Sequence, residues 1–176
     1  MMKVNRLAIW LVVLAVSIAV ALTIWGLDYW YREEENYTEI EPGLYLGGFV
    51  LEPPPGCKAV ISLYELGDPF EAEVHIREPI RDSAPAPSLA WLRRMVEAID
   101  QQRSAGRTTF VHCSHGVSRS AMLVAAFLMY KHRWSRDQAL EFLHSKRPQT
   151  RPNPAFMQLL LDWERELQVR NDDRPR

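Results

Sequence analysis

The sequence predicts an α/β fold in which a small central sheet is flanked by helices. Short β-prone runs occupy residues 43–48, 58–63, 73–80 and 107–112. Several of these runs are almost continuously apolar, which is typical of strands that are covered on both faces. Helical patterns interleave with them and then follow them. This order favours an α/β sandwich with parallel crossovers.

Capping signals and apolar periodicity indicate where the helices begin. Ser88 suits the N-cap of a helix that runs to about Ser104 and carries apolar residues along one face. A second helix is predicted over residues 119–132. Ser135 opens a third with the spacing of a capping box. Asn153 before a proline predicts the start of the last helix, which runs to about residue 169.

Length and charge leave room for one domain plus an appendage. The 176 residues carry a formal charge of −1, and removing Lys3 and Arg6 leaves −3 over residues 28–176. Proteins that bind nucleic acid carry a basic surplus, so we expect no nucleic-acid partner. Cys57 and Cys113 supply neither a disulfide framework nor a zinc set. We predict no metal and no cofactor, and we expect Cys57 to lie in the core.

The appendage is an apolar segment, Leu7 to Leu27, without a charged residue. As a helix it would extend about 31 Å, enough to cross the hydrocarbon core of a bilayer. We therefore expect a transmembrane helix and a single-pass membrane localisation. A cleaved signal peptide is the alternative, because Ala19-Val20-Ala21 fits a small-x-small cleavage site. Lys3 and Arg6 before the segment favour a folded domain outside the cytoplasm.

These features divide the chain into five predicted parts. The charged stretch "DYWYREEENYTEIE" reads as a solvated tether, so we expect the folded part to begin just after it. The parts are an N-terminal flank (1–6), a transmembrane anchor (7–27), a linker (28–40), a single folded domain (41–168) and a polar tail (169–176).

One stretch, "FVHCSHGVSRSAMLV", places a cysteine where a strand gives way to a helix. A loop in this position turns its backbone N–H groups inward, and the following helix points its positive end at the same spot, so the loop suits an anion with several oxygens. Gly116 permits the turn, and the planar fork of Arg119 fits two phosphate oxygens. We predict a phosphate-binding loop made of Ser114, His115, Gly116, Val117, Ser118 and Arg119.

The cysteine gives this loop a chemical role. Backbone amides, the helix dipole and Arg119 would lower the pKa of the Cys113 thiol and favour the thiolate. A thiolate beneath a bound phosphate is a nucleophile aimed at phosphorus. We expect Ser120 to donate to the sulfur and His112 to orient the loop from behind. A buried structural cysteine beside a capping loop is the alternative, but it leaves the glycine and the arginine unexplained.

Residues 111–120, "VHCSHGVSRS", resemble the signature H-C-x-x-G-x-x-R-S of the cysteine-dependent dual-specificity protein phosphatases. Residues 43–48 resemble the early strand of that family, and residues 147–164 resemble its closing segment. The resemblance spans about residues 41–168 and implies a cysteine-phosphatase-like α/β sandwich. The chain differs at His115, where the family often has alanine.

The resemblance also implies a general acid that protonates the leaving oxygen and then deprotonates the attacking water. Asp82, in "EPIRDSAPAPS", matches the family's acid after "P-I-x-D". An aspartate beside Ser83 also suits a turn, and Asp68 and Asp100 are poorer candidates for the acid. Asn153 has a sufficient role as a helix cap, although similar asparagines brace the active-site loops of the family.

Three functions are open to such a chain. The first is hydrolysis of protein phosphotyrosine, and also phosphoserine or phosphothreonine, through a phosphocysteine on Cys113. The second is hydrolysis of a phospholipid or phosphoinositide, attractive for a domain joined to an apolar segment. Enzymes for several phosphates usually carry lysines in the loop, whereas of the variable positions Ser114, His115, Val117 and Ser118 only His115 can be cationic, which favours one phosphate. The third is a pseudophosphatase that binds phosphate. The expected partners are a phosphorylated protein or phospholipid, and a membrane through Leu7 to Leu27.

Overall fold

A five-stranded mixed sheet forms the centre of the folded domain. The structure, a computed structural model, describes residue 10, residues 13–23 and residues 36–172. The chain divides into two compact units, residues 1–35 and 36–176. The strands are β1 (Tyr37–Glu41), β2 (Leu44–Gly47), β3 (Ala59–Ser62), β4 (Val74–Arg77) and β5 (Thr109–His112). Their order is β1-β2-β5-β3-β4; β1 pairs antiparallel with β2, and the other neighbours are parallel.

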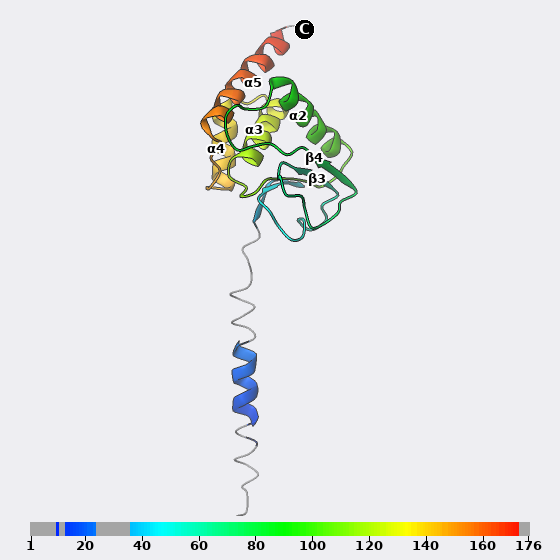
Figure 1. Ribbon diagram of the computed structural model, residues 1–176, viewed down its shortest axis with the longest axis vertical. Coiled ribbons are helices and arrows are strands. Elements are labelled where there is room, and N and C mark those ends of the chain that lie inside the picture. Colours follow the sequence, from blue (N-terminus) through cyan, green and yellow to red (C-terminus); the bar gives the residue numbers. More distant parts are fainter. Residues whose placement is uncertain (1–9, 11–12, 24–35, 173–176) are drawn as a thin grey trace, which may run out of the picture. The chain divides into compact units, whose positions relative to one another are not determined.

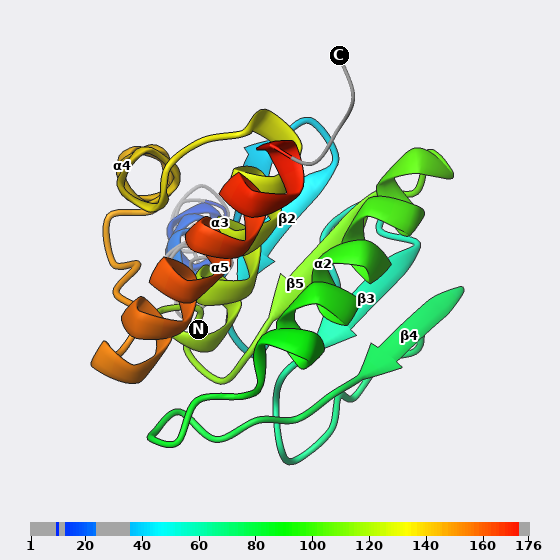
Figure 2. The same cartoon turned by 90° about the horizontal axis from the view of Figure 1, so that it is seen from above.

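Helices cover one face of this sheet. They are α2 (Leu89–Ser104), α3 (Arg119–His132), α4 (Arg136–Lys146) and α5 (Pro154–Asp172). Figures 1 and 2 show α2, α3 and α5 on the same side of the strands. The central helix α3 is buried along residues 119–129, and Trp163 of α5 donates its indole N–H to the carbonyl of Ala126 at 3.0 Å. The helix that follows the cysteine loop is therefore fixed on several sides.

The predicted caps are present. Ser88 accepts a hydrogen bond from the backbone N–H of Trp91 at 3.1 Å, and Ser135 forms the reciprocal capping box. Asn153 accepts from the backbone N–H of Phe156 at 3.0 Å. Each cap satisfies an N–H group that the first turn of a helix leaves without a partner. The α/β class and the four predicted strands are confirmed.

The predicted linker contains a fifth strand. Residues 37–40 were expected to belong to a tether, yet β1 pairs with β2 from Tyr37 opposite Gly47 onward. The charged residues conceal the strand in the sequence, but Ile40 is buried at 2 % exposure. At the other end, α5 continues to Asp172 into the predicted polar tail.

The expected membrane anchor is corrected by the structure. Across the part of the chain that is described, no helix combines the length and the apolar character needed to span a membrane. Residues 13–23 are helical. The predictions of a single-pass membrane localisation and of a domain on its outer side are therefore wrong. The rest of the expected segment, residues 7–9, 11–12 and 24–27, lies outside the described residues, as does the flank 1–6.

The register of the parallel strands gathers their following loops at one edge. His112 lies opposite Gly47 of β2 and Ser62 of β3, and Ser62 lies opposite Arg77 of β4. Parallel strands have their carboxyl ends together, and ligands bind in α/β sheets at that edge. The cysteine loop and the loops after β2, β3 and β4 therefore meet there.

Candidate active site

The cysteine loop turns its carbonyl oxygens away from its centre. Four successive carbonyls are held from outside: Ser114 by the N–H of Phe49 at 2.9 Å, His115 by Arg147 Nη2 at 3.4 Å, Gly116 by Arg147 Nε at 3.0 Å and Val117 by the N–H of Arg151 at 2.7 Å. A peptide whose oxygen points outward directs its N–H inward. The predicted nest of N–H groups is therefore consistent with the backbone of the loop.

Gly116 allows the loop to turn against β2. Its φ is +70°, in the left-handed region, and a Cβ atom built there would lie 2.5 Å from the carbonyl carbon of Gly47. Any other residue would be strained and would also clash with backbone. The predicted need for glycine at this position is confirmed.

Arg147 is a site residue that the sequence reasoning missed. Its side chain lies behind the loop and is 3 % exposed. Besides the loop carbonyls, it donates to Asn36 Oδ1 at 2.7 Å and to Thr38 Oγ1 at 3.2 Å. The residue opens the segment that resembles the family's closing sequence, so the signal was present, but its partners lie about 30 to 110 positions away in the chain.

Cys113 lies at the base of the loop and is 1 % exposed. Its sulfur is 3.3 Å from Ser120 Oγ and accepts from the N–H of Gly116 at 3.3 Å. Burial raises the pKa of the Cys113 thiol, but hydrogen bonds from Ser120 and Gly116 and the charge of Arg119 lower it more, so the pKa is lowered overall. The contact predicted between Ser120 and the sulfur is present. Ser120 also donates to the carbonyl of Gly47 at 3.0 Å.

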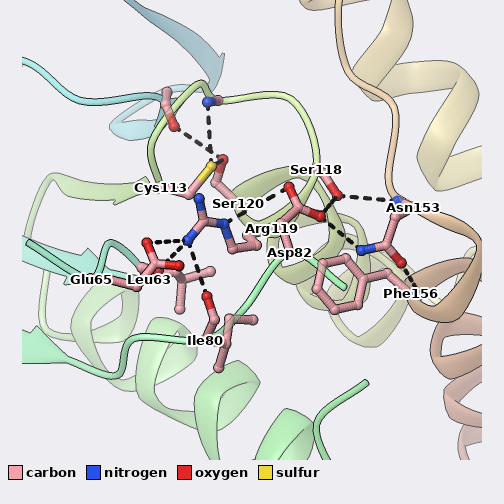
Figure 3. A network of polar contacts seen from close by, with 12 residues as sticks. Leu63, Glu65, Ile80, Asp82, Cys113, Ser118, Arg119, Ser120, Asn153 and Phe156 are labelled. Atoms are coloured by element: carbon pink, nitrogen blue, oxygen red, sulfur yellow. Dashed lines mark hydrogen bonds and ion pairs between the residues drawn. The ribbon is translucent and has the colours of Figure 1, made fainter. Parts of the chain in front are cut away.

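Arg119 starts α3 beneath the loop, as Figure 3 shows, and is 5 % exposed. Its Nη1 donates to Glu65 Oε2 at 2.6 Å and to the carbonyls of Leu63 at 3.2 Å and Ile80 at 3.0 Å. Its Nε is buried and has no hydrogen-bond partner. One end of the guanidinium is thus anchored while a second N–H remains unsatisfied. Glu65, which was not anticipated, orients the group.

Asp82 lies at the rim, on the loop after β4 (Figure 3). Its Oδ1 accepts from Ser118 Oγ at 2.6 Å and from Asn153 Nδ2 at 2.7 Å, while Oδ2 is 3.9 Å from Arg119 Nε. The side chain is 38 % exposed. The carboxyl is therefore fixed at one oxygen and accessible to solvent, close to the group expected to hold phosphate. Asn153 both caps α5 and braces this carboxylate.

Asp68, the reserve candidate for a general acid, does not lie at the rim. Its side chain is fully buried and 2.8 Å from His75 Nε2. The same carboxylate lies 3.2 Å from His112 Nε2, and the His112 side chain is also fully buried. Burial lowers the pKa of His112 more than the neighbouring Asp68 raises it, so the imidazole is neutral at neutral pH.

The remaining residues that the sequence analysis singled out lie outside the network around Cys113 and Arg119. His115 is exposed on the loop, so its ring lies at the rim as the sequence suggested. Cys57 is half-buried, and burial raises the pKa of its thiol to about 11, which keeps it protonated. Among the described residues, no group of three histidine, cysteine or acidic side chains is arranged to hold a metal ion.

An open pocket of about 460 Å³ lies at the same edge of the sheet, lined among others by Phe49, Tyr64, Leu66 and Arg77. The rings of Phe49 and Tyr64 are 5.4 Å apart between centroids. The backbone N–H of Phe49 donates to the carbonyl of Ser114 in the cysteine loop, and Tyr64 lies between Leu63 and Glu65, which both accept hydrogen bonds from Arg119. Apolar and aromatic surface thus adjoins the phosphate-binding loop.

A buried cysteine of lowered pKa at the base of a loop that is followed by a buried arginine is the arrangement expected of a cysteine-dependent phosphatase. The family model "Dual specificity phosphatase, catalytic domain" matches residues 59–166. The chain belongs to the dual-specificity phosphatase family and carries the catalytic domain of this class of hydrolases.

Individual relatives agree with this assignment. The chain is 32% identical over 147 residues to human dual specificity protein phosphatase 16, covering 74% of this chain and 21% of that protein. It is 31% identical over 150 residues to dual specificity protein phosphatase 1 of Arabidopsis thaliana, covering 79% and 74% respectively. It spans between 21% and 40% of the length of the first curated relatives it matches.

Solved structures share the fold. A mouse putative dual specificity phosphatase complexed with zinc tungstate superposes with a TM-score of 0.72 at 25% identity, over 80% of this chain and 93% of that one. PTPMT1 in complex with PI(5)P superposes with a TM-score of 0.70 at 24% identity, over 77% and 99%. The PTPMT1 likeness concerns the fold alone.

Proposed function

We propose that residues 41–168, together with β1, form a phosphatase domain that hydrolyses phosphate monoesters of proteins, phosphotyrosine foremost. Phosphoserine and phosphothreonine are secondary substrates. The nucleophile is Cys113, the phosphate is held by Arg119 and the N–H groups of residues 114–118, and Asp82 is the general acid and base. His112 and Ser120 position and assist the sulfur.

The first step transfers the phosphoryl group to sulfur. The Cys113 thiolate attacks phosphorus, an S–P bond forms and the P–O bond to the leaving group breaks. Asp82 gives its proton to the departing oxygen, which otherwise leaves as a basic alkoxide or phenoxide. The loop N–H groups and Arg119 stabilise the charge on the phosphoryl oxygens in the transition state.

The second step restores the enzyme. A water molecule attacks the phosphorus of the phosphocysteine, and the Asp82 carboxylate removes a proton from it. The S–P bond breaks and the electron pair returns to Cys113. The single hydroxyl proton of Ser120 has two acceptors within reach, the sulfur at 3.3 Å and the carbonyl of Gly47 at 3.0 Å, and its donation to the sulfur stabilises the thiolate as it reforms. The products are inorganic phosphate and the free thiolate.

The observation that carries the proposal is the unsatisfied Nε of Arg119. A buried charged donor without a hydrogen bond is costly, so it calls for an explanation. Phosphate oxygens would satisfy it, and the other end of the same guanidinium is already anchored by Glu65. The mouse phosphatase was solved with zinc tungstate, and tungstate is a tetrahedral oxyanion of the same shape as phosphate.

The aromatic pocket favours a protein substrate with an aryl phosphate. Phe49 and Tyr64 offer ring faces beside the loop, where the ring or a neighbouring side chain of a phosphotyrosine peptide would lie. Phosphoinositide hydrolysis is the second candidate, because the PTPMT1 structure contains PI(5)P. The loop here lacks lysine, so we place a singly phosphorylated substrate before one with several phosphates. A phosphate-binding pseudophosphatase is the non-enzymatic alternative.

A single-turnover assay with p-nitrophenyl phosphate tests the proposal, with the wild type beside Cys113→Ser. The wild type is expected to release nitrophenolate and the variant to release none, while both bind vanadate or tungstate. Equal release by the two proteins would refute a cysteine mechanism. Anion binding without release by the wild type would identify a pseudophosphatase. Comparing a phosphotyrosine peptide with short-chain PI(5)P then separates protein from lipid substrates.

A further inference from the structure

Three buried titratable side chains, Asp68, His75 and His112, form a group that we call the His–Asp–His cluster. They come from three segments: the loop after β3, strand β4 and the last residue of β5. Val111 and Ile76 pack into the helix-covered core. Alternate residues of a strand face opposite sides, so His112 and His75 lie on the other face of the sheet.

The cluster is closely packed and shielded from water. Asp68 and His112 are fully buried and the His75 side chain is 8 % exposed. Phe70 stacks on His75 with 7° between the planes, and Phe110 stacks on His112 with 12°. The aromatic rings hold the two imidazoles against the carboxylate and exclude solvent from it.

The two histidines contact Asp68 differently. His75 Nε2 is hydrogen-bonded to Oδ2 at 2.8 Å. His112 Nε2 is 3.2 Å from Oδ1, but neither atom has a partner with hydrogen-bond geometry. A buried carboxylate costs several kcal/mol when it is left uncompensated. Something must therefore offset the cost of burying Asp68. Its position behind the Cys113 nucleophile suggests a role in the active site.

The cluster reaches Cys113 through His112. The backbone carbonyl of His112 accepts from the N–H of Leu63 at 2.9 Å, and the N–H of the next residue, Cys113, donates to Gly47 at 3.2 Å. The backbone at the end of β5 is thereby fixed on both sides. Only the imidazole side chain of His112 is not fixed by these two hydrogen bonds. Contact with Asp68 restricts the orientation of this ring, which is carried by the residue directly before Cys113.

We propose that Asp68 and His75 are positioning residues for the Cys113 nucleophile, acting through the imidazole of His112. This inference rests on the proposed function, in which Cys113 is the nucleophile. Asp68 contacts no substrate. It holds His112 in place, and His75 holds Asp68, so that the loop N–H groups stay directed at the sulfur.

The test measures the reactivity of the sulfur rather than turnover. Cys57→Ser leaves Cys113 as the single thiol, because the chain has two cysteines. The rate of alkylation by iodoacetamide is then recorded from pH 4 to 9 in this background, alone and with Asp68→Asn, His75→Phe or His75→Gln. Arg119 and Arg147 are the cations near the sulfur, Glu65 and Asp82 are the acids beside Arg119, and these variants leave all four in place.

The direction of the change separates positioning from simple electrostatics. If Asp68 positions the loop, the loop N–H groups of the Asp68→Asn variant lose their hydrogen bonds to the sulfur. The pKa of Cys113 then rises, and alkylation at low pH slows about threefold or more. If Asp68 acted only through its negative charge, removing it would lower that pKa and speed alkylation. An unchanged or faster rate overturns the proposal.

Two further variants guard against a misfolded Asp68→Asn. His75→Phe keeps the stacking on Phe70 but loses the donor to Asp68, and is expected to slow alkylation as Asp68→Asn does. His75→Gln retains an N–H donor and is expected to restore the rate. Glu71→Gln is the matched control, since this carboxylate is 87 % exposed and 3.9 Å from His75 Nδ1.

Alkylation also separates this inference from the proposed function. A wild type that turns over no phosphate ester, yet shows Asp68-dependent alkylation, keeps the positioning role and refutes the phosphatase. A wild type that turns over normally, with alkylation independent of Asp68 and His75, supports the phosphatase and refutes the positioning role.

Discussion

The hydroxyl of Ser118 donates a 2.6 Å hydrogen bond to Asp82 Oδ1. Ser118 belongs to the cysteine loop and Asp82 to the loop after β4, so this bond joins the expected phosphate-binding and proton-transfer elements. Asn153 donates to the same oxygen at 2.7 Å and, through its backbone N–H, to Ser118 Oγ at 3.1 Å. The side chains of Ser118 and Asn153 therefore fix the carboxylate of Asp82.

Asp82→Asn is expected to slow the enzyme according to the leaving group. Protonation matters when the departing oxygen is basic, so the rate with phosphotyrosine should fall about 10²-fold or more. The fall should be smaller with an activated aryl phosphate, measured as kcat/KM for a series of substituted phenyl phosphates. Ser118→Ala serves as the intermediate variant, with a smaller loss of the same kind. Equal losses for good and poor leaving groups would make Asp82 a loop-forming residue.

Ser120→Ala is expected to move the activity to higher pH. The Ser120 hydroxyl is among the groups that lower the pKa of the Cys113 thiol, so removing it raises that pKa. Less thiolate is then present at a given acidic pH, and the acidic limb of the kcat/KM profile shifts upward. The remote Ser145→Ala, whose hydroxyl bonds to Phe142 in α4, should leave the limb in place. A limb that does not move would exclude Ser120 from stabilising the sulfur.

Arg119→Lys is expected to lose most of the activity despite the retained charge. Lysine can still pair with Glu65, but it lacks the planar fork and the Nε donor that are expected to hold phosphate. The loss in transition-state stabilisation should be about 2 to 4 kcal/mol, the scale of one preorganised donor. Steady-state kcat/KM gives this figure directly. Nearly normal kinetics would contradict the role assigned to the guanidinium.

Arg147→Gln is expected to weaken the fold as well as the site. The side chain holds two loop carbonyls together with Asn36 and Thr38, and a shorter amide cannot reach all of them. Leaving buried acceptors without a donor should cost about 2 to 4 kcal/mol in the free energy of unfolding, measured by urea denaturation. Arg165→Gln is the matched control, with a side chain 66 % exposed and an expected change within about 0.5 kcal/mol. Equal stability of the two variants would rule out a structural role for Arg147.

Local sequence signals predicted the elements of the fold and the cysteine loop well. Caps such as Ser88 and the glycine of the loop act over a few residues, so their patterns can be read directly. Strand β1 was not predicted, because its charged residues resemble a solvated tether and only the pairing with β2 buries Ile40. The prediction of a transmembrane helix over the apolar N-terminal segment was wrong, because it rested on the composition of that segment alone.

The partners of the site residues could not be predicted in the same way. Glu65 anchors Arg119 from 54 positions away, and Arg147 reaches Asn36 across 111 positions. Such contacts depend on how the sheet is ordered, which places loops from distant parts of the chain at one edge. Asp68 looked like a loop acid in the sequence and is a buried partner of two histidines for the same reason.

The most direct test of the central claim is to trap the phosphocysteine. Wild-type protein and Asp82→Asn are mixed with excess phosphotyrosine or aryl phosphate, quenched in acid within one turnover, digested and examined by mass spectrometry. We predict one added phosphoryl group on the peptide that contains Cys113, and none on that peptide from Cys113→Ser. Hydrolysis by the wild type with no phosphoryl group on Cys113 at any quench time, or the same adduct on the serine variant, would contradict the mechanism.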